Sequence, residues 1–384
     1  MTTKPLWLND FVTQVSANSS NAITLASTTT ESAGVGDSLT AGDKRAQLWL
    51  SPSGDFAFGF RQLVKRYLYL LAIWYNKIPD KTIVCLQGTE IWKAGFNLGD
   101  AANGFMNDTG DFILSNSAFE ILWRSFDHPT DTLLSGQTLN SLLPRQILDS
   151  GGQMLSSRLT ETNFSRGRFQ FHLIPDGNAV LNTINLPTGF AYEAYFWSNT
   201  VDSNPSNAGL HVVFDELGYL YVFRASSKRE LLTTGTVVAA AENYHRVTLI
   251  FYVVLVQYTH AMNSTGNGGN WSIIHSMPDD ICTDLTRLNG TRPCGFNGIR
   301  QLSKDRRPTC SCPQRFSLLN PNDDYGSCRP DFYTQFCEDV SNSPEDFDFL
   351  ELENTNWPAS NYEMYHLIIS RNARRLAAKI ASAM

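Results

Sequence analysis

Turns that contain glycine recur along the first 270 residues, and each is followed by a short segment in which apolar and polar residues alternate. Alternation with a period of two is typical of strands with one buried face. The glycines lie at irregular intervals, so the pattern predicts an all-β body with internal pseudo-symmetry and variable loops, not a solenoid. The four units are SPSGDFAFGF (51–60), NDTGDFILSN (107–116), IPDGNAVLNT (174–183) and ELGYLYVFRA (216–225), with glycines at Gly54, Gly110, Gly177 and Gly218.

The most apolar stretch of the chain is VTLIFYVVLV, at 247–256. It is too short to cross a bilayer as a helix, which needs about 20 residues. Its β-branched and aromatic residues predict one buried strand instead, and we expect no transmembrane segment. The start of the chain, MTTKPLWLNDFVTQVSA, shows no apolar core of the length that a signal peptide needs.

Composition agrees with a folded, strand-rich protein. The 384 residues are 42% hydrophobic and 17% charged, with 23 Phe, 14 Tyr and 8 Trp, and leave room for two or three domains. A formal net charge of −7 argues against a nucleic-acid partner.

Five of the seven cysteines fall between Cys282 and Cys328, in a polar segment rich in Pro, Gly, Asn and Asp. Such a segment cannot bury enough apolar surface to hold itself together, so the cysteines act as bridges or as metal ligands. No C-x2-4-C pair is present, which disfavours structural zinc. Bridges imply an oxidising compartment, and an odd total leaves at least one free thiol, for which Cys85 is a candidate.

The string CGFNGI…RRPTCSCPQRFSLLNPNDDYGSC resembles the EGF-like module of plant S-domain receptor-like kinases. The framework of that module implies the pairs Cys294–Cys310 and Cys312–Cys328. Arg300 stands where its third cysteine is expected, which leaves Cys282 without its usual partner. Cys337, just beyond the module, is the remaining candidate to pair with Cys282.

The upstream segments WLSPSGDFAFGF, LAIWYNKIPDKTIV and LWRSFDHPTDTLLSGQ are similar to the bulb-type lectin domain of the same family, and YHRVTL matches the region before its EGF-like module. The resemblance implies β-prisms, each of three four-stranded sheets, with Trp74, Trp123 and Phe126 in the core. After Val84 the segment CLQG (85–88) runs directly into TEIW (89–92), so roughly one strand pair of the family pattern is missing near Cys85.

The fold expected is therefore all-β, with tandem β-prism domains followed by a small disulfide-rich EGF-like module. The domains we predict are an N-terminal segment without an evident signal (1–21), a bulb-type lectin-like domain (22–147), a second lectin-like, S-locus-glycoprotein-like domain (148–276), the EGF-like module (277–330), a PAN-like remnant (331–363) and a divergent basic tail (364–384).

The resemblance also supplies a candidate sugar site. The mannose motif of bulb-type lectins, Q-x-D-x-N-x-V-x-Y, fits best on 174–182, where Asp176, Asn178 and Val180 are kept but Ile174 and Asn182 replace Gln and Tyr. We therefore expect weak or undetectable mannose binding, with any residual site at these three residues. The alternative is that Asp176 and Asn178 only form the turn.

No kinase signature, G-x-S-x-G elbow or H-E-x-x-H pair occurs in the chain, so we expect no enzyme activity, no cofactor and no metal site. The prediction is a non-catalytic, lectin-like receptor ectodomain, secreted or on the cell exterior, that recognises a glycan or glycoprotein; a homodimer is left open. Two alternatives remain: a kinase in family name only, and a truncated product without function. Sequons for N-glycosylation fit a secreted surface and lie at Asn18, Asn107, Asn163, Asn263, Asn270 and Asn289.

Overall fold

The computed structural model describes residues 33–34, 48–62, 69–87, 101–140, 153–186, 188–263, 270–279, 294–303, 308–321 and 323–332. Within these ranges the protein is all-β, as predicted, and all its strand pairs are antiparallel; its one helical element is a 3-10 turn, η2 (Ser125–Asp127). The chain divides into a main unit, 1–279, and a C-terminal unit, 280–384.

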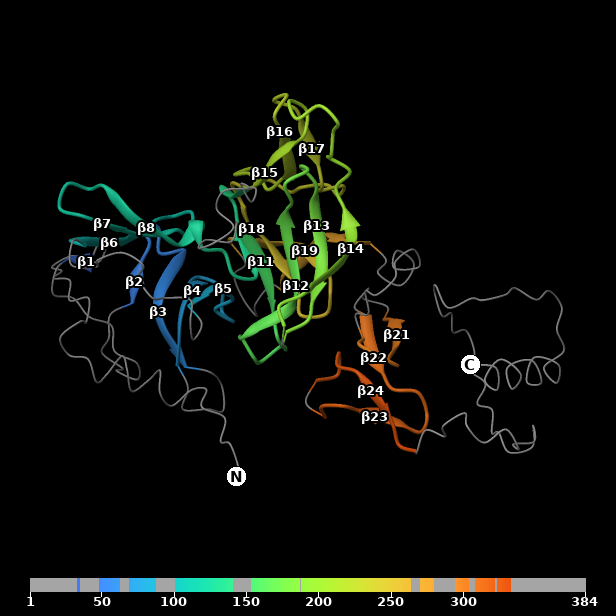
Figure 1. Ribbon diagram of the computed structural model, residues 1–384. Coiled ribbons are helices and arrows are strands. Elements are labelled where there is room, and N and C mark those ends of the chain that lie inside the picture. The colour runs from blue at the N-terminus through green and yellow to red at the C-terminus, as the bar shows by residue number, and fades with distance from the viewer. Residues whose placement is uncertain are drawn as a thin grey trace, which may run out of the picture. The chain divides into compact units, whose positions relative to one another are not determined.

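The first part of the main unit, which we call the N-terminal region, contains two four-stranded sheets (Figure 1). One sheet has the order β2-β3-β4-β5 and the other β1-β6-β7-β8. The strands are β1 (Ala33–Gly34), β2 (Trp49–Leu50), β3 (Phe56–Gln62), β4 (Tyr69–Tyr75), β5 (Ile83–Gln87), β6 (Asn103–Met106), β7 (Phe112–Ser115) and β8 (Ile121–Arg124).

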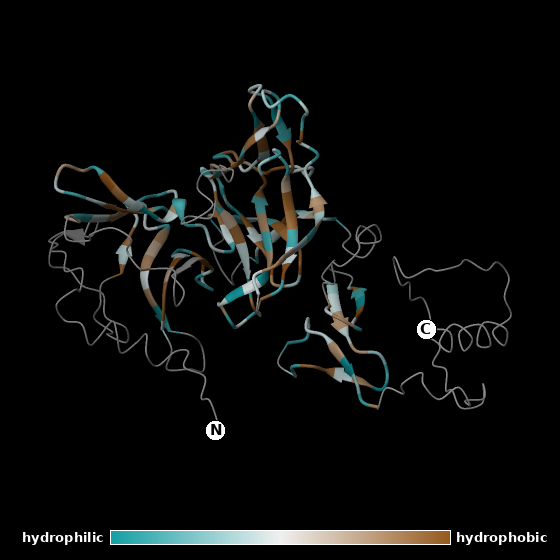
Figure 2. Cartoon of the chain, in the orientation of Figure 1, coloured by the Kyte–Doolittle hydropathy of each residue, from teal (hydrophilic) through white to brown (hydrophobic). Residues whose placement is uncertain are grey.

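The second part of the main unit, which we call the three-sheet body, contains twelve consecutive strands in three four-stranded sheets: β10-β15-β16-β17, β11-β12-β13-β14 and β20-β19-β18-β9. Much of the length of these strands is hydrophobic in Figure 2. The strands are β9 (Thr132–Leu134), β10 (Gln137–Asn140), β11 (Met154–Arg158), β12 (Arg166–Leu173), β13 (Ala179–Ile184), β14 (Ala191–Trp197), β15 (Gly209–Phe214), β16 (Leu220–Arg224), β17 (Arg229–Leu231), β18 (Asn243–Leu249), β19 (Leu255–Ala261) and β20 (Ser272–Met277).

Strand pairing in this body crosses residue 147. β9 pairs with β18, and β10 pairs with β15, although β9 and β10 both precede residue 148. By pairing, the body therefore begins at Thr132, and the domain boundary at 147/148 stays a prediction. The shortening near Cys85 also stays a prediction, because residues 88–100 lie outside the described ranges.

The four glycine turns have the same geometry, as their pattern predicts. Each glycine has a φ between +74° and +92° and donates its N–H to the carbonyl three residues earlier, at 2.8–3.2 Å. A Cβ on Gly177 would meet the backbone nitrogen of Gly209 at 2.5 Å, so both the backbone angle and the space there require glycine. The strand that follows each turn is β3, β7, β13 or β16.

The prediction of one buried strand across 247–256 is wrong. β18 ends at Leu249 and β19 begins at Leu255, and the two strands pair with each other as a hairpin. Val253, with a φ of +93°, donates its N–H to the carbonyl of Ile250. The turn residues are apolar, and Tyr252 and Val253 are buried, so the turn carries none of the polar or glycine signals by which turns are recognised in sequence.

The core of the N-terminal region is aromatic and includes a side chain from the body. Phe58 stacks on Phe112 with ring centroids 4.2 Å apart, which joins the two sheets. Tyr244 from β18 belongs to the same buried cluster, and Trp271 packs against it. The predicted core residues Trp74, Trp123 and Phe126 are all buried, at 4–8% exposure.

In the C-terminal unit the structure forms two disulfides, Cys294–Cys310 and Cys312–Cys328, the pairs that the resemblance implies. Two-stranded sheets flank them, made of β21 (Ile299–Leu302) with β22 (Pro308–Ser311) and β23 (Phe316–Leu318) with β24 (Cys328–Pro330). Arg300, at the position of the expected cysteine, lies directly opposite Cys310 in the first pair. Cys282, Cys337, the PAN-like remnant beyond residue 332 and the basic tail lie outside the described residues.

Candidate functional site

The candidate residues Asp176 and Asn178 lie in the hairpin that joins β12 to β13. The Oδ1 atom of Asp176 accepts a hydrogen bond from the N–H of Asn178 at 2.9 Å. The Oδ1 atom of Asn178, which is 6% exposed, accepts one from the N–H of Thr200, also at 2.9 Å. Both side chains thus satisfy backbone donors around the turn, which leaves one acceptor fewer on each for a sugar hydroxyl.

Val180 is 3% exposed and lies inside β13, directly opposite His172 on β12 and Trp197 on β14. Directly opposed residues of neighbouring strands have their side chains on the same face of the sheet. Val180 therefore packs on the sheet face among side chains of the neighbouring strands, whereas Asp176 lies exposed in the turn.

In the two glycine turns of the N-terminal region, the residue equivalent to Asn178 is an aspartate, and it also has a structural role. Asp111, which follows Gly110, is fully buried and accepts hydrogen bonds from Arg124 Nε at 2.8 Å, Ser125 Oγ at 2.9 Å and the N–H of Phe126 at 3.0 Å. Burial raises the pKa of this carboxyl, and the hydrogen bonds from Phe126 and Arg124 oppose that shift. Asp111 therefore links the start of β7 to the end of β8 and to η2 through hydrogen bonds.

Asp55, which follows Gly54, links the N-terminal region to β18. Its Oδ1 atom accepts a hydrogen bond from the hydroxyl of Tyr244 at 2.7 Å and forms an ion pair with Lys77 Nζ at 2.8 Å. Burial and this hydrogen bond raise the pKa of Tyr244 far above its usual range. Asp55 and Asp111, the N-terminal counterparts of Asn178, thus hold the fold together.

The structure brings a second group of polar residues to the sheet face beside Val180. Gln170 and His172 come from β12 and Asn182 from β13, and Gln170 lies directly opposite Asn182. Burial lowers the pKa of His172, so the ring is neutral at pH 7. Sequence reasoning had singled out only Asn182, as a replaced motif residue, because His172 and Gln170 join this face through a cross-strand register that no local pattern reveals.

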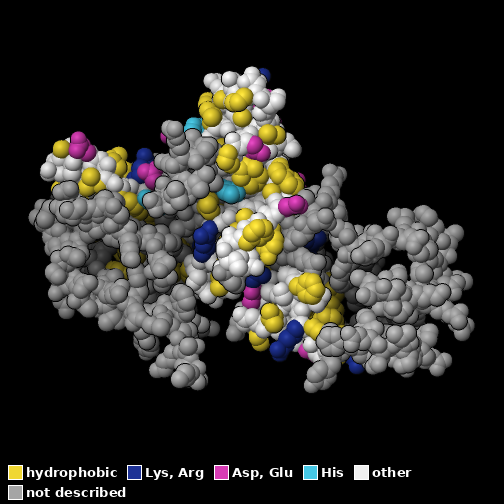
Figure 3. Space-filling model, viewed as in Figure 1, with side chains coloured by type: hydrophobic (Ala, Val, Ile, Leu, Met, Phe, Trp, Pro, Cys, Tyr) yellow, Lys and Arg dark blue, Asp and Glu magenta, His cyan; other side chains and the backbone are white. Residues whose placement is uncertain are grey.

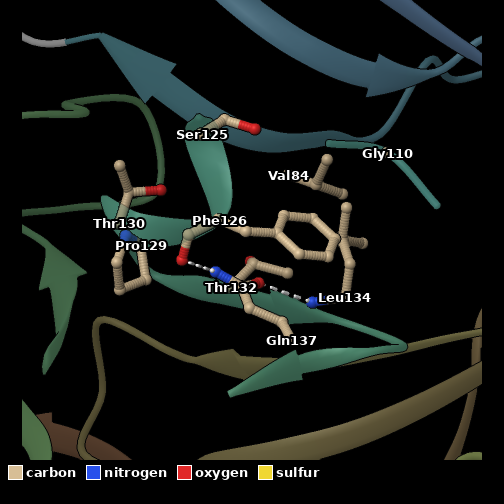
Figure 4. Close-up of a pocket in the computed structure, with 9 residues that line it drawn as sticks. All are labelled: Val84, Gly110, Ser125, Phe126, Pro129, Thr130, Thr132, Leu134 and Gln137. Atoms are coloured by element: carbon tan, nitrogen blue, oxygen red, sulfur yellow. Dashed lines mark hydrogen bonds between the residues drawn. The ribbon is translucent and has the colours of Figure 1, made fainter. Parts of the chain in front are cut away.

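A small cavity lies where the two parts of the main unit meet (Figure 4). Its volume is about 10 Å³, room for about one water molecule and no more. Gln137 closes one side by donating from Nε2 to the carbonyl of Phe126 at 3.0 Å and by accepting the N–H of Leu134 at 3.1 Å. The cavity is too small for any sugar ring, so it is not the ligand site.

Three predicted glycosylation positions, Asn163, Asn263 and Asn270, are exposed. Asn107 is half-buried, and its Oδ1 atom accepts hydrogen bonds from Thr109 and from the N–H of Asp111. Asn18 and Asn289 lie outside the described residues. Across the part of the chain that the structure describes, no helix has the length and apolar character to cross a membrane.

These features define an all-β protein whose C-terminal unit is held by disulfides. No family model matches the chain. It is 34% identical over 374 residues to the G-type lectin S-receptor-like serine/threonine-protein kinase RLK1 of Arabidopsis thaliana. The aligned region covers 86% of this chain and 43% of RLK1. It is also 34% identical over 379 residues to LECRK4 of Oryza sativa, with 89% of this chain and 45% of the relative covered.

The chain is thus a homologue of the G-type lectin S-receptor-like kinases, and it spans less than half the length of these relatives. Among solved structures, a Japanese Marasmius oreades lectin covers 40% of this chain and 93% of its own, at 12% identity and a TM-score of 0.25. A similarity at that level carries no argument about fold or ligand.

Proposed function

We propose that this chain is a non-catalytic recognition module of the G-type lectin receptor family, which binds a glycan or glycoprotein on the cell exterior. The observation that carries the proposal is the match to the lectin receptor kinases over 86% of the chain but only 43% of RLK1. The two disulfides of the C-terminal unit support an oxidising, extracellular compartment.

Mannose itself binds weakly or not at all under this proposal. The motif at 174–182 lacks its Gln and Tyr, and the Oδ1 atoms of Asp176 and Asn178 already accept backbone hydrogen bonds. Each missing hydrogen bond removes on the order of 1 kcal/mol, so two losses lower affinity roughly tenfold to a hundredfold.

The family name includes a kinase, but the chain has no phosphate-binding loop, catalytic H-R-D loop or D-F-G motif. The proposal therefore expects no phosphotransferase activity from the purified chain. Transfer of labelled phosphate from ATP to a generic protein substrate, in material free of contaminating kinase, would contradict it.

The experiment that tests recognition is a glycan-array screen of the chain secreted from eukaryotic cells, followed by calorimetry with mannose and with each array hit. We expect at least one complex glycan to bind and mannose to bind weakly or not detectably. Mannose binding in the micromolar range that is abolished by Asp176→Ala would show that the degenerate motif is a functional mannose site. A chain that is folded but binds no glycan would refute the proposal.

A further inference from the structure

The hairpin that joins β13 to β14 carries a group of apolar side chains on its surface. In Figure 3, exposed hydrophobic side chains gather in patches over the strands of the three-sheet body. On this hairpin, Phe190 is 64% exposed and Leu186 is 39% exposed, and the half-buried Tyr192 lies beside Phe190. Apolar side chains that are grouped on a surface, unlike single ones, are typical of binding sites.

Hydrogen bonds fix the arrangement of the two rings. Phe190 and Tyr192 meet edge to face, with ring centroids 5.4 Å apart and planes at 82°. Asn185 donates from Nδ2 to the hydroxyl of Tyr192 at 3.3 Å, and its N–H donates to the carbonyl of Phe190 at 2.8 Å. Gly189, with a φ of +70°, donates its N–H to the carbonyl of Asn185 at 2.7 Å and closes the turn. The perpendicular rings therefore form two walls of a corner that is ordered before a ligand arrives.

Polar groups surround the rings and keep part of their hydrogen-bonding capacity. The hydroxyls of Tyr192 and Thr188 each accept a hydrogen bond at 3.3 Å, but neither donates one within the part of the chain that the structure describes. Oδ1 of Asn185 has only a long contact, 3.3 Å, with the N–H of Thr188. No charged residue occurs in 185–192. An aromatic wall with a few uncharged donors and acceptors suits a neutral ligand that has both an apolar face and hydroxyl groups.

The hairpin is separate from the turn that carries the sugar motif. Asp176 and Asn178 precede β13, whereas Asn185 and Phe190 follow it. The six residues of β13 separate the two hairpins by about 20 Å, at about 3.3 Å per residue. One sugar ring therefore cannot contact both hairpins.

We propose that the β13–β14 hairpin binds one neutral pyranose of a glycan, which packs its C–H face on Phe190. Its hydroxyls hydrogen-bond to Tyr192, Thr188 and Asn185. The inference rests on the proposed function and names the place at which the glycan binds. A β-linked glucose, in which every ring hydroxyl is equatorial, covers the aromatic ring more fully than mannose, whose axial 2-hydroxyl interrupts one face. The sugar expected at this hairpin is therefore of the β-linked glucose type.

The test measures, by calorimetry, the affinity of the secreted chain for cellotetraose, a neutral chain of β-linked glucose. Phe190→Ala should lower the affinity about tenfold or more, because it removes the ring on which the sugar packs. Tyr192→Phe, which removes one hydroxyl, should lower it roughly threefold to tenfold. Two controls should each change it less than twofold: Phe119→Ala, at a ring of the N-terminal region that is 74% exposed, and Asp176→Ala, at the motif turn.

The outcomes separate this inference from the proposed function. Cellotetraose binding that survives Phe190→Ala, or that is lost in Asp176→Ala, would overturn the inference. A folded chain that binds another glycan on the array but not cellotetraose would overturn the inference alone, and a folded chain that binds no glycan would refute both. Circular dichroism and thermal unfolding of each variant identify losses due to misfolding, and Phe190→Trp, which keeps an aromatic wall, should retain part of the affinity.

Discussion

The two parts of the main unit bury their cores in different ways. The three-sheet body buries Phe169, Phe171 and Phe214 completely, and its twelve strands follow one another along the chain. The N-terminal region has two four-stranded sheets in the described residues, and its aromatic cluster takes in Tyr244, with Met262 and Trp271 packed against it, from segments of the body.

The contacts between these two parts are specific and partly polar. Tyr75 donates its hydroxyl to the carbonyl of His245 at 3.0 Å, and Trp271 donates from Nε1 to Thr82 at 2.8 Å. Within the body, the guanidinium of Arg246 lies over the rings of Tyr258 and Trp271, 4.4 Å from each centroid, and burial lowers its pKa. The N-terminal region therefore takes part of its core from the body.

The largest effect expected is on the core of the body. Phe171→Ala should lower the free energy of unfolding by about 3–5 kcal/mol, because it removes a fully buried ring. Since the N-terminal cluster includes Tyr244, both parts should lose stability together, which urea unfolding followed by tryptophan fluorescence and by hydrogen exchange would measure. Phe190→Ala, at an exposed side chain, is the control and should change stability by less than about 0.5 kcal/mol. An N-terminal region that keeps its protection in Phe171→Ala would break the comparison.

Two tyrosines allow a matched comparison between a hydrogen bond that joins the two parts and a hydrogen bond within the body. Tyr75 reaches from the N-terminal region to the body, whereas Tyr195 donates to the carbonyl of Val253 at 2.7 Å within the body. Each change to Phe removes one buried hydrogen bond and should lower stability by about 1 kcal/mol. Hydrogen exchange should show faster opening confined to the N-terminal region in Tyr75→Phe, and faster opening of the whole main unit in Tyr195→Phe. The same pattern in both variants would contradict the asymmetry.

The stability of the folded chain is expected to decrease gradually as the pH is lowered. Burial lowers the pKa of His172, His245 and His275, which all lie in the body. A histidine whose pKa is lowered by folding binds its proton more readily in the unfolded chain than in the folded one. The stability of the folded chain should therefore fall as the pH is lowered through about 6.5. Urea unfolding at pH 7.5 and 5.5 should show a lower midpoint at pH 5.5, with the change reduced in His275→Gln. A midpoint unchanged between the two pH values would refute this account of the histidines.

Local signals in the sequence predicted local structure well. Gly54, Gly110, Gly177 and Gly218 marked their turns because a left-handed backbone leaves a chemical signature, and the aromatic core positions followed from the resemblance. The turn at Ile250–Val253 left no such signature, because its residues are apolar and include neither glycine nor a typical polar turn residue. The sheet face around His172 depends on the register of three strands, and pairing of β9 and β10 with later strands depends on contacts far apart in sequence, so neither was predictable from pattern.

Hydroxyl-radical footprinting of the secreted chain, with and without a saturating glycan from the array, tests the central claim most directly. The account predicts that oxidation of Phe190 and Tyr192 falls when the glycan is bound, while oxidation of Phe119, a side chain of the N-terminal region that is 74% exposed, stays unchanged. Protection of Phe119 with no change at Phe190 and Tyr192 would contradict it, because the ligand would then lie on the N-terminal region and not on the three-sheet body.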